Sequence, residues 1–206
     1  MIIIMDLEEE KKLQKRGSKY VIGIDEAGRG PLAGPVVAAA VYYKGKKALD
    51  GVRDSKKISP KKREQIFVKL TNHPCVCWGL GIVSSAKIDK VNILEATKMA
   101  MEEAVLDLQK KYKIKPDFLI LDGKMSINIP INQFSIVKAD DKVFSCAAAS
   151  IIAKVFRDRL MVKMDEKYPE YGFKKHKGYG TREHKRMIKK YGLSAIHRKT
   201  FRIRGI

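Results

Sequence analysis

The sequence has few of the features that mark membrane, secreted or disulfide-linked proteins. It contains three cysteines, Cys75, Cys77 and Cys146, whose odd number and spacing fit neither a disulfide framework nor a Cys-x-x-Cys zinc or redox site. Its longest apolar runs, such as residues 35–43, fall far short of the about 20 residues that cross a bilayer. The apolar first five residues are followed by acidic ones, without the basic region and cleavage site of a secretory signal. We therefore expect a reduced, cytoplasmic protein that does not insert into membranes.

Acidic residues are scarce relative to basic ones. Lys and Arg number 43 against 23 Asp and Glu, so the formal net charge is +20, and residues 151–206 hold 17 basic but only 5 acidic residues. A solvated surface explains any single lysine, but such an excess is typical of proteins that bind nucleic acid. We expect the following set to face a nucleic-acid backbone: Lys174, Lys175, Lys177, Arg182, Lys185, Arg186, Lys189 and Lys190.

The length of 206 residues, with 45% hydrophobic and 32% charged residues, is typical of one globular domain. Apolar runs predict strands over residues 20–25, 35–43, 75–84, 117–122 and 134–138. Helical spacing and capping residues predict helices over residues 8–16, 59–70, 92–112, 144–167 and 181–190. Strands in hairpin order, followed by strands that alternate with helices, predict an α/β fold with a mixed sheet covered by helices.

In this basic chain, acidic side chains stand where predicted strands end. Asp25 and Glu26 close the first strand, Asp122 closes the fourth, and Asp140 and Asp141 follow the fifth. In sheets with parallel strands, active sites lie at the ends of the strands. Carboxylates that cluster there are suitable ligands for Mg²⁺ or Mn²⁺. Position alone leaves surface roles, or a simple turn at Asp122, as equally good interpretations. Regular β alternation also prevents Asp25 and Glu26 from both facing one site, unless the strand departs from it there.

The glycine-rich loop at residues 28–34 follows a predicted strand, as phosphate-binding loops do. Pro31, Pro35 and a second strand stand where the dinucleotide fingerprint requires a helix, and no Gly-Lys-Ser/Thr ending is present. Nucleotide binding is therefore disfavoured. The glycines still allow the backbone to approach a ligand closely beside the acid pair.

Residues 23–35, Gly-Ile-Asp-Glu-Ala-Gly-Arg-Gly-Pro-Leu-Ala-Gly-Pro, closely resemble the signature of ribonuclease HII, the type 2 ribonuclease H. Further matches follow in the family's order at residues 54–56, 121–124, 137–140, 148–155 and 176–179. The resemblance covers about residues 20–201. It implies a ribonuclease H-like fold, with a five-stranded mixed sheet flanked by helices and a helical C-terminal part.

The resemblance also implies an activity and a domain plan. The family hydrolyses the RNA strand of RNA–DNA hybrids and nicks 5′ of single ribonucleotides in duplex DNA, leaving a 3′-hydroxyl and a 5′-phosphate, by a two-metal mechanism with Mg²⁺ or Mn²⁺. We expect one catalytic domain over residues 1–206, with a leading helix in about residues 1–19 and a basic helical part over about 144–206. A monomer is our default expectation.

Four acidic positions match the catalytic, metal-binding carboxylates of the family: Asp25, Glu26, Asp122 and Asp140. The residue before the fourth acid is Ala139 where the family usually has glycine. The neighbouring Asp141 competes for the fourth role, but alignment to the Ala-Ser-Ile block that follows favours Asp140.

Other positions match substrate-binding residues of the family. The loop Gly28-Arg29-Gly30 matches the one that senses the ribose 2′-hydroxyl, by which proteins distinguish RNA from DNA. Tyr179 matches the tyrosine that packs on the sugar at the RNA–DNA junction, and Lys56 and Ser150 match positions near substrate phosphates.

The remaining candidates receive structural roles. The histidines His73, His176, His184 and His197 lack the close spacing of a metal site, although His176 lies near Tyr179 in the sequence. We expect Asp158 to be structural and to pair with Arg157 or Arg159.

Two alternatives remain beside the metal-dependent nuclease. A non-catalytic nucleic-acid-binding module would explain the charge but would give the four acids no task. A type 3 ribonuclease H would be expected to carry an extra N-terminal domain and a different residue in place of Arg29, and neither expectation fits this sequence.

Overall fold

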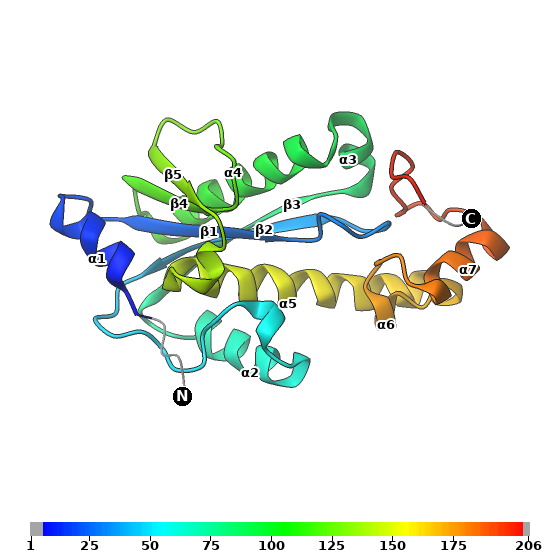
Figure 1. Ribbon diagram of the computed structural model, residues 1–206, viewed down its shortest axis with the longest axis horizontal. Helices are drawn as coiled ribbons and strands as arrows, with labels where there is room; N and C mark the ends of the chain where they lie inside the picture. Colours follow the sequence, from blue (N-terminus) through cyan, green and yellow to red (C-terminus); the bar gives the residue numbers. More distant parts are fainter. Residues whose placement is uncertain (1–5, 204–206) are drawn as a thin grey trace.

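A five-stranded sheet in the order β3-β2-β1-β4-β5 forms the centre of the computed structural model, which describes residues 6–203 (Figure 1). β1 (Val21–Ala27) pairs antiparallel with β2 (Val36–Tyr43), which pairs antiparallel with β3 (Val76–Val83). On its other side β1 pairs parallel with β4 (Phe118–Asp122), and β4 pairs parallel with β5 (Asn132–Ile136). The mixed α/β sheet predicted from the sequence is therefore confirmed.

Helices cover both faces of the sheet. Figure 1 shows α4 (Ile93–Tyr112) and α5 (Phe144–Lys167) on opposite sides of it, with α2 (Pro60–Thr71) packed on the outer side of α5. Gly79 and Gly81 on β3 allow α4 to pack closely, because a Cβ at either position would overlap the α4 backbone. No helix in residues 6–203 is long and apolar enough to cross a membrane.

The other helices are short and lie at the two ends of this frame. They are α1 (Glu8–Lys15), α3 (Ser85–Val91), α6 (Phe173–His176) and α7 (Arg182–Tyr191), with single 3-10 turns η1 (Ser55–Lys57), η2 (Ala139–Asp141) and η3 (Pro169–Tyr171). α6 and α7 lie beside the far end of α5, where they bury a separate apolar cluster with the loop around Leu32 (Figure 1). The C-terminal part thus packs against the loop that follows β1.

Helix starts follow the capping residues closely. The side chain of Ser59 accepts a hydrogen bond from the backbone N–H of Lys62, and the side chain of Thr181 accepts one from the backbone N–H of His184. α2 and α7 each begin one residue after these caps. The fifth strand was predicted at 134–138 but spans Asn132–Ile136, because Lys138 has φ +59°, which ends extended structure and leads into η2.

α1 is fastened to the start of α5 by a buried acid. Glu10 Oε1 accepts hydrogen bonds from the backbone N–H of Ser145 and from its hydroxyl, both at 2.8 Å. Ser145 lies in the first turn of α5, where backbone N–H groups lack helical partners. Burial raises the pKa of Glu10, which shows that desolvation outweighs these hydrogen bonds.

Candidate active site

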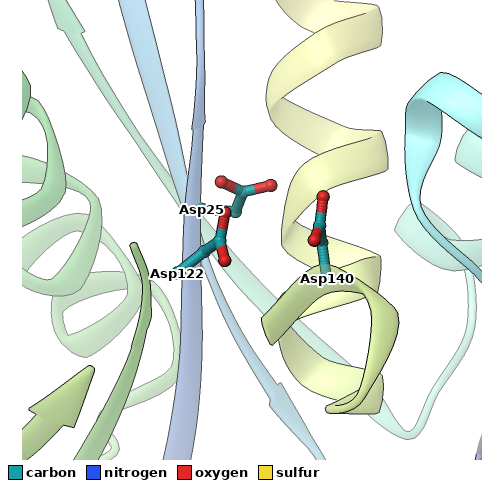
Figure 2. Close-up of side chains that lie close together, drawn as sticks. All are labelled: Asp25, Asp122 and Asp140. Carbon is teal, nitrogen blue, oxygen red and sulfur yellow. The ribbon is translucent and has the colours of Figure 1, made fainter. Parts of the chain in front are cut away.

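The parallel pairing of β1 with β4 brings two acids to the same edge of the sheet. Ile24 is paired with Leu121, so Asp25 and Asp122 follow at neighbouring positions. Asp140 reaches them from η2, the turn before α5. One carboxylate oxygen from each of the three lies within 4.8 Å of the others (Figure 2). We call Asp25, Asp122 and Asp140 the acid cluster.

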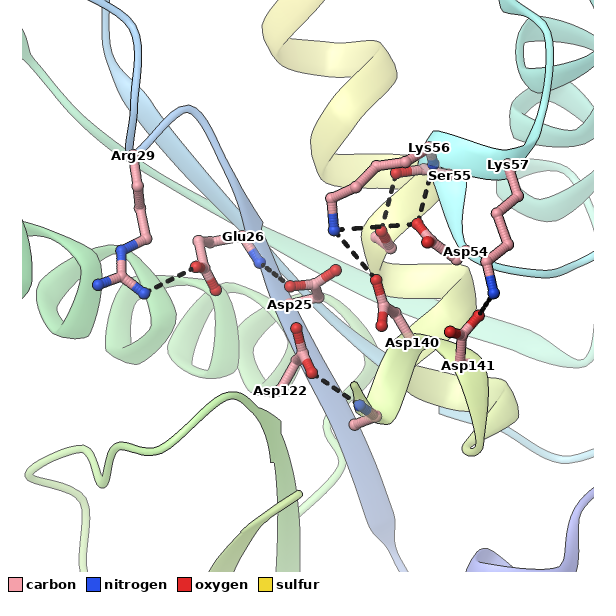
Figure 3. A network of polar contacts seen from close by, with 12 residues as sticks. Asp25, Glu26, Arg29, Asp54, Ser55, Lys56, Lys57, Asp122, Asp140 and Asp141 are labelled. Atoms are coloured by element: carbon pink, nitrogen blue, oxygen red, sulfur yellow. Dashed lines mark hydrogen bonds and ion pairs between the residues drawn. The ribbon is translucent and has the colours of Figure 1, made fainter. Parts of the chain in front are cut away.

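Glu26 lies beside the acid cluster but does not belong to it. It remains within β1 and is not among the three acids whose oxygens lie within 4.8 Å of one another, although its charge acts on Asp25. Its backbone N–H donates to Asp25 Oδ1 at 2.7 Å, and its Oε1 lies 3.4 Å from Arg29 Nη1 (Figure 3). Three of the four expected carboxylates therefore converge, and the fourth borders them.

Burial makes the charged forms of these acids costly. It raises the pKa of Asp25 well above its usual range, and the negative charges of Glu26 and Asp122 raise it further. Burial likewise raises the pKa of Asp140, against the lowering effect of Lys56. Burial also raises the pKa of Glu26, although Arg29 opposes it. The site thus concentrates negative charge that its own cations do not neutralise.

Two carboxylate oxygens at this site are buried without a hydrogen-bond partner in residues 6–203: Asp25 Oδ2 and Glu26 Oε2. A buried oxygen left in this way costs free energy unless a ligand satisfies it. Hard divalent cations take oxygen ligands of this kind. The residues present therefore fit Mg²⁺ or Mn²⁺, with Asp25, Asp122 and Asp140 as the central ligands.

Lys56 borders the acid cluster on the side of η1. Its Nζ lies 3.2 Å from Asp140 Oδ2 and 3.9 Å from Asp54 Oδ1 (Figure 3). Burial alone would lower the pKa of Lys56, but the neighbouring carboxylates raise it overall. Asp141 pairs instead with Lys57 at 2.6 Å, so Asp140 is the residue of the two that joins Asp25 and Asp122.

Ser150, expected near a substrate phosphate, lies close to Ser55 of η1. It is buried on α5, and its Oγ lies 2.9 Å from that of Ser55. This contact joins η1 to α5 directly behind the acids. Its proximity to a substrate phosphate stays a prediction.

The loop Gly28-Arg29-Gly30 connects the acid cluster to the C-terminal part. Gly28 has φ +100°, and a Cβ there would overlap the side chain of Arg157, so glycine is required on both grounds. Arg29 and Gly30 are exposed, whereas Gly28 is buried. The exposed part of the loop can therefore meet a ligand that also approaches the acids.

Tyr179 lies on the loop after α6 and is 42% exposed. Lys154 Nζ lies 5.5 Å from the centre of its ring. A groove of about 950 Å³ opens beside it between α2 and α5, lined by basic residues that include Lys163 and Lys177. An exposed ring beside a basic groove suits contact with nucleic acid.

Three buried histidines support the Tyr179 loop from behind. His176 and His184 stack with ring centres 4.3 Å apart, and His184 Nε2 lies 3.0 Å from His197 Nε2. His197 Nδ1 accepts the backbone N–H of Ser194, so its Nε2 carries the proton and donates to His184, whose Nδ1 then donates to the Tyr179 carbonyl. Burial lowers the pKa of both His184 and His197 to about 4, in keeping with neutral rings. We call these three residues the histidine network.

Two arginines behind the glycine loop were not predicted as functional residues. Arg157 and Arg198 are buried and donate to carbonyls of the loop and its flanks. The helical spacing of Arg157 could have indicated its burial, because Ala153 and Met161, four residues to either side on the same face of α5, are also buried. Arg198 lies in irregular structure and offers no such pattern.

The expected pairing of Asp158 was wrong. Its carboxylate pairs with Lys154 at 2.8 Å and with Arg63 at 3.9 Å, rather than with Arg157 or Arg159. Lys154 lies one helical turn before Asp158, on the same face of α5, whereas Arg157 and Arg159 project elsewhere. Arg159 pairs with Glu64 of α2.

Residues 22–204 match the family model described as Ribonuclease HII. The chain belongs to the ribonuclease HII family. A ribonuclease HII of Caldicellulosiruptor bescii is 48% identical over 194 residues, which cover 94% of this chain and 92% of the relative. One of Acholeplasma laidlawii is 50% identical over 198 residues, or 96% and 95% of the two chains.

Solved structures agree with this assignment. The crystal structure of the ribonuclease H2 from Pyrococcus horikoshii is similar with a TM-score of 0.69 and 31% identity, over 90% of this chain and 95% of that one. The resemblance found in the sequence motifs is thereby confirmed, as is the ribonuclease H-like fold. The chain is a type 2 ribonuclease H enzyme.

Proposed function

We propose that this enzyme hydrolyses the RNA strand of RNA–DNA hybrids and also nicks duplex DNA on the 5′ side of a single ribonucleotide, leaving a 3′-hydroxyl and a 5′-phosphate. The observation that carries the proposal is the acid cluster, in which Asp25 holds a buried oxygen without a partner in the described residues. Such a cluster in a chain of net charge +20 suits a polyanionic substrate cut with the help of cations.

Asp25, Asp122 and Asp140 would hold Mg²⁺ or Mn²⁺, with Glu26 beside them. When bound, two such ions supply activation of a water for in-line attack and stabilisation of the departing 3′-oxygen. Lys56, at 3.2 Å from Asp140, keeps that carboxylate oriented toward the other two acids. The negative charge of the acids without cations would itself repel a phosphodiester, so substrate and cations favour each other's binding.

Residues outside the acid cluster would contact the sugar and the phosphates of the substrate. The exposed part of Gly28-Arg29-Gly30 would meet the ribose 2′-hydroxyl, and the exposed ring of Tyr179 would pack on the sugar at the junction. The basic groove beside Tyr179 suits the phosphate backbone of the duplex. We propose one catalytic domain over residues 1–206 that acts as a monomer in the cytoplasm; its first five and last three residues lie outside the described part.

A non-catalytic nucleic-acid-binding module is the alternative function. It would use the basic C-terminal part alone. The acid cluster speaks against it, because three carboxylates close together beside a nucleic-acid surface would weaken binding by a module that holds no cation.

The test uses a DNA duplex that contains one ribonucleotide and a matched duplex of DNA alone. We expect Mg²⁺ or Mn²⁺ to support a single nick on the 5′ side of the ribonucleotide, and a chelator to abolish it. The all-DNA duplex should remain intact. Binding of both duplexes without nicking in any metal would overturn the proposal in favour of the module.

A further inference from the structure

Arg157 on α5 and Arg198 near the C-terminal end of the described chain lie behind the glycine loop, 0% and 1% exposed. We call them the arginine pair. Buried guanidinium groups usually pair with a carboxylate, but neither residue forms an ion pair within residues 6–203. Asp158, next to Arg157 in sequence, pairs with Lys154 and Arg63. The pair therefore serves another purpose than neutralising an acid.

Arg198 is bonded to the carbonyls of the glycine loop itself. Its Nη2 donates to the Gly28 carbonyl at 2.5 Å and its Nη1 to the Arg29 carbonyl at 2.8 Å. Its Nε and Nη2 both donate to the Gly34 carbonyl, at 3.0 and 2.9 Å. One planar side chain thus fixes the two ends of the loop relative to each other.

Arg157 extends this hold to the loop that carries Tyr179. Its Nε donates to the Pro35 carbonyl at 2.9 Å and its Nη2 to that of Ala33 at 3.1 Å. Its Nη1 donates to the Lys177 carbonyl at 3.1 Å, two residues before Tyr179. The two loops that would touch the ribonucleotide are therefore held by one pair of side chains.

The position of Arg198 is itself fixed by backbone contacts on both sides. Its own N–H donates to the Leu32 carbonyl at 2.8 Å. Asp89 on α3 accepts hydrogen bonds from the backbone N–H groups of Lys199 and Thr200, each at 3.0 Å. The guanidinium is consequently presented to the glycine loop from a rigid segment.

The hydrogen bonds of Arg198 also decide which groups of the loop face outward. In a trans peptide the C=O and the following N–H point in opposite directions, and no peptide bond in the described chain is cis. Because the Gly28 and Arg29 carbonyls point toward Arg198, the N–H groups of Arg29 and Gly30 point away from it. Those two residues are exposed, so their N–H groups are donors for an acceptor such as a ribose hydroxyl.

We infer that Arg198, supported by Arg157, is a positioning residue that determines selectivity for a ribonucleotide over a deoxyribonucleotide. It turns the Gly28 and Arg29 carbonyls inward, and thereby aims the loop's N–H donors at the 2′-hydroxyl. It does not touch the substrate. The inference rests on the proposed function, since it concerns the loop that would sense the 2′-hydroxyl.

The test measures equilibrium binding of two duplexes that differ by one 2′-hydroxyl, with Asp122→Asn as the parent so that no cleavage occurs. We expect the parent to bind the ribonucleotide duplex about three- to tenfold more tightly, as one hydrogen bond contributes. Adding Arg198→Met should bring this ratio close to one while changing the affinity for all-DNA duplex less than about twofold. Arg198→Lys should restore part of the ratio, since an ammonium group keeps the charge and some of the donors.

Leu108→Ala is the matched control for loss of stability. Leu108 is fully buried on α4, on the opposite face of the sheet from α5, and within residues 6–203 its apolar cluster contains no residue of the glycine loop, so the variant should lower Tm and leave the ratio unchanged. Should Arg198→Met fail to fold, Arg198→Lys and Arg157→Lys decide the question. An unchanged ratio in the folded arginine variants would overturn the inference, whereas a parent without any preference would overturn the proposed function instead.

Discussion

The acid cluster and the arginine pair each gather side chains of a single charge, the acids at the end of β1 and the arginines behind the glycine loop that follows it. In the acid cluster, Asp25 retains an oxygen without a hydrogen-bond partner in residues 6–203. In the arginine pair, the guanidinium groups donate to backbone carbonyls. The unsatisfied oxygen of Asp25 is available to a ligand among the other acids, whereas the satisfied arginines form a scaffold that shapes its neighbours.

The largest expected effect comes from breaking the acid cluster alone. Asp122→Asn keeps the shape of the side chain and removes a charge that a cation needs, so we expect cleavage of the ribonucleotide duplex to fall about a thousandfold or more. Duplex binding should stay largely intact, because the arginine pair and the basic groove are untouched. Single-turnover cleavage and equilibrium binding measure the two quantities. Full activity in this variant would remove Asp122 from the site.

A cation titration at several pH values sharpens the comparison. Burial raises the pKa of Asp25 and of Asp140, so protons compete with a cation at higher pH than they would at exposed carboxylates. We expect Mn²⁺ at a hundredfold excess over its Kd to raise Tm by about 5–10 °C at pH 8, and by progressively less toward pH 5.

The matched variants for that titration separate the two halves of the site. Asp122→Asn should lose the Mn²⁺-dependent rise in Tm, whereas Arg198→Met should keep it. A rise that did not depend on pH would contradict the assignment of the cation to the acid cluster.

Acid should weaken the histidine network behind the Tyr179 loop. Burial lowers the pKa of His184 and of His197 to about 4, so between pH 6.5 and 4 the unfolded chain binds protons that the folded chain does not. Stability is therefore full above pH 6.5 and falls as the pH drops through this window. We expect His197→Asn to show a loss of Tm between pH 6.5 and 4.5 that is smaller than in the parent protein by about 5 °C. Equal losses would show that the histidine network does not titrate in this way.

The smallest expected effect concerns Glu10, a buried acid outside the cluster, whose Oε2 also lacks a partner in the described residues. Glu10→Gln keeps the oxygen that accepts from Ser145. It also removes a buried carboxylate whose charged form is costly, as the raised pKa of Glu10 indicates, so Tm at pH 8 should stay equal or rise. Glu10→Ala should cost about 1 kcal/mol, because α5 loses its N-terminal acceptor. The Mn²⁺ response should be the same in both variants, and a weaker response would place Glu10 among the groups that affect cation binding.

Much of the acid cluster was predictable from short-range patterns. The apolar runs before Asp25 and Asp122 marked two strands that end in acids, and the parallel pairing that unites them is what the alternation of later strands and helices favours. The position after the fifth strand marked both Asp140 and Asp141, and the family resemblance was needed to choose Asp140, since a left-handed Lys138 redirects the chain before it. Glu26 was marked by its place beside Asp25, and the structure leaves it at the border of the cluster.

The arginine pair was beyond such patterns. In the sequence, Arg157 and Arg198 are two of 43 basic residues, and a basic residue is most often exposed. What distinguishes them is the carbonyl groups that the distant glycine loop brings to them, which only the tertiary structure reveals. α3 was missed for a local reason, because seven residues directly after β3 are too few to show a helical period.

The bond between Arg198 and the Gly28 carbonyl joins residues 170 positions apart. A ribosome adds roughly 5–20 residues per second, so Arg198 is synthesised roughly 10–30 s after Gly28. Until then, the nascent polypeptide holds its glycines without the side chain that turns their carbonyls inward. If Arg198 positions the loop as inferred above, discrimination between the two kinds of sugar arises only after Arg198 has been synthesised, although the glycine loop that would meet the 2′-hydroxyl is made much earlier.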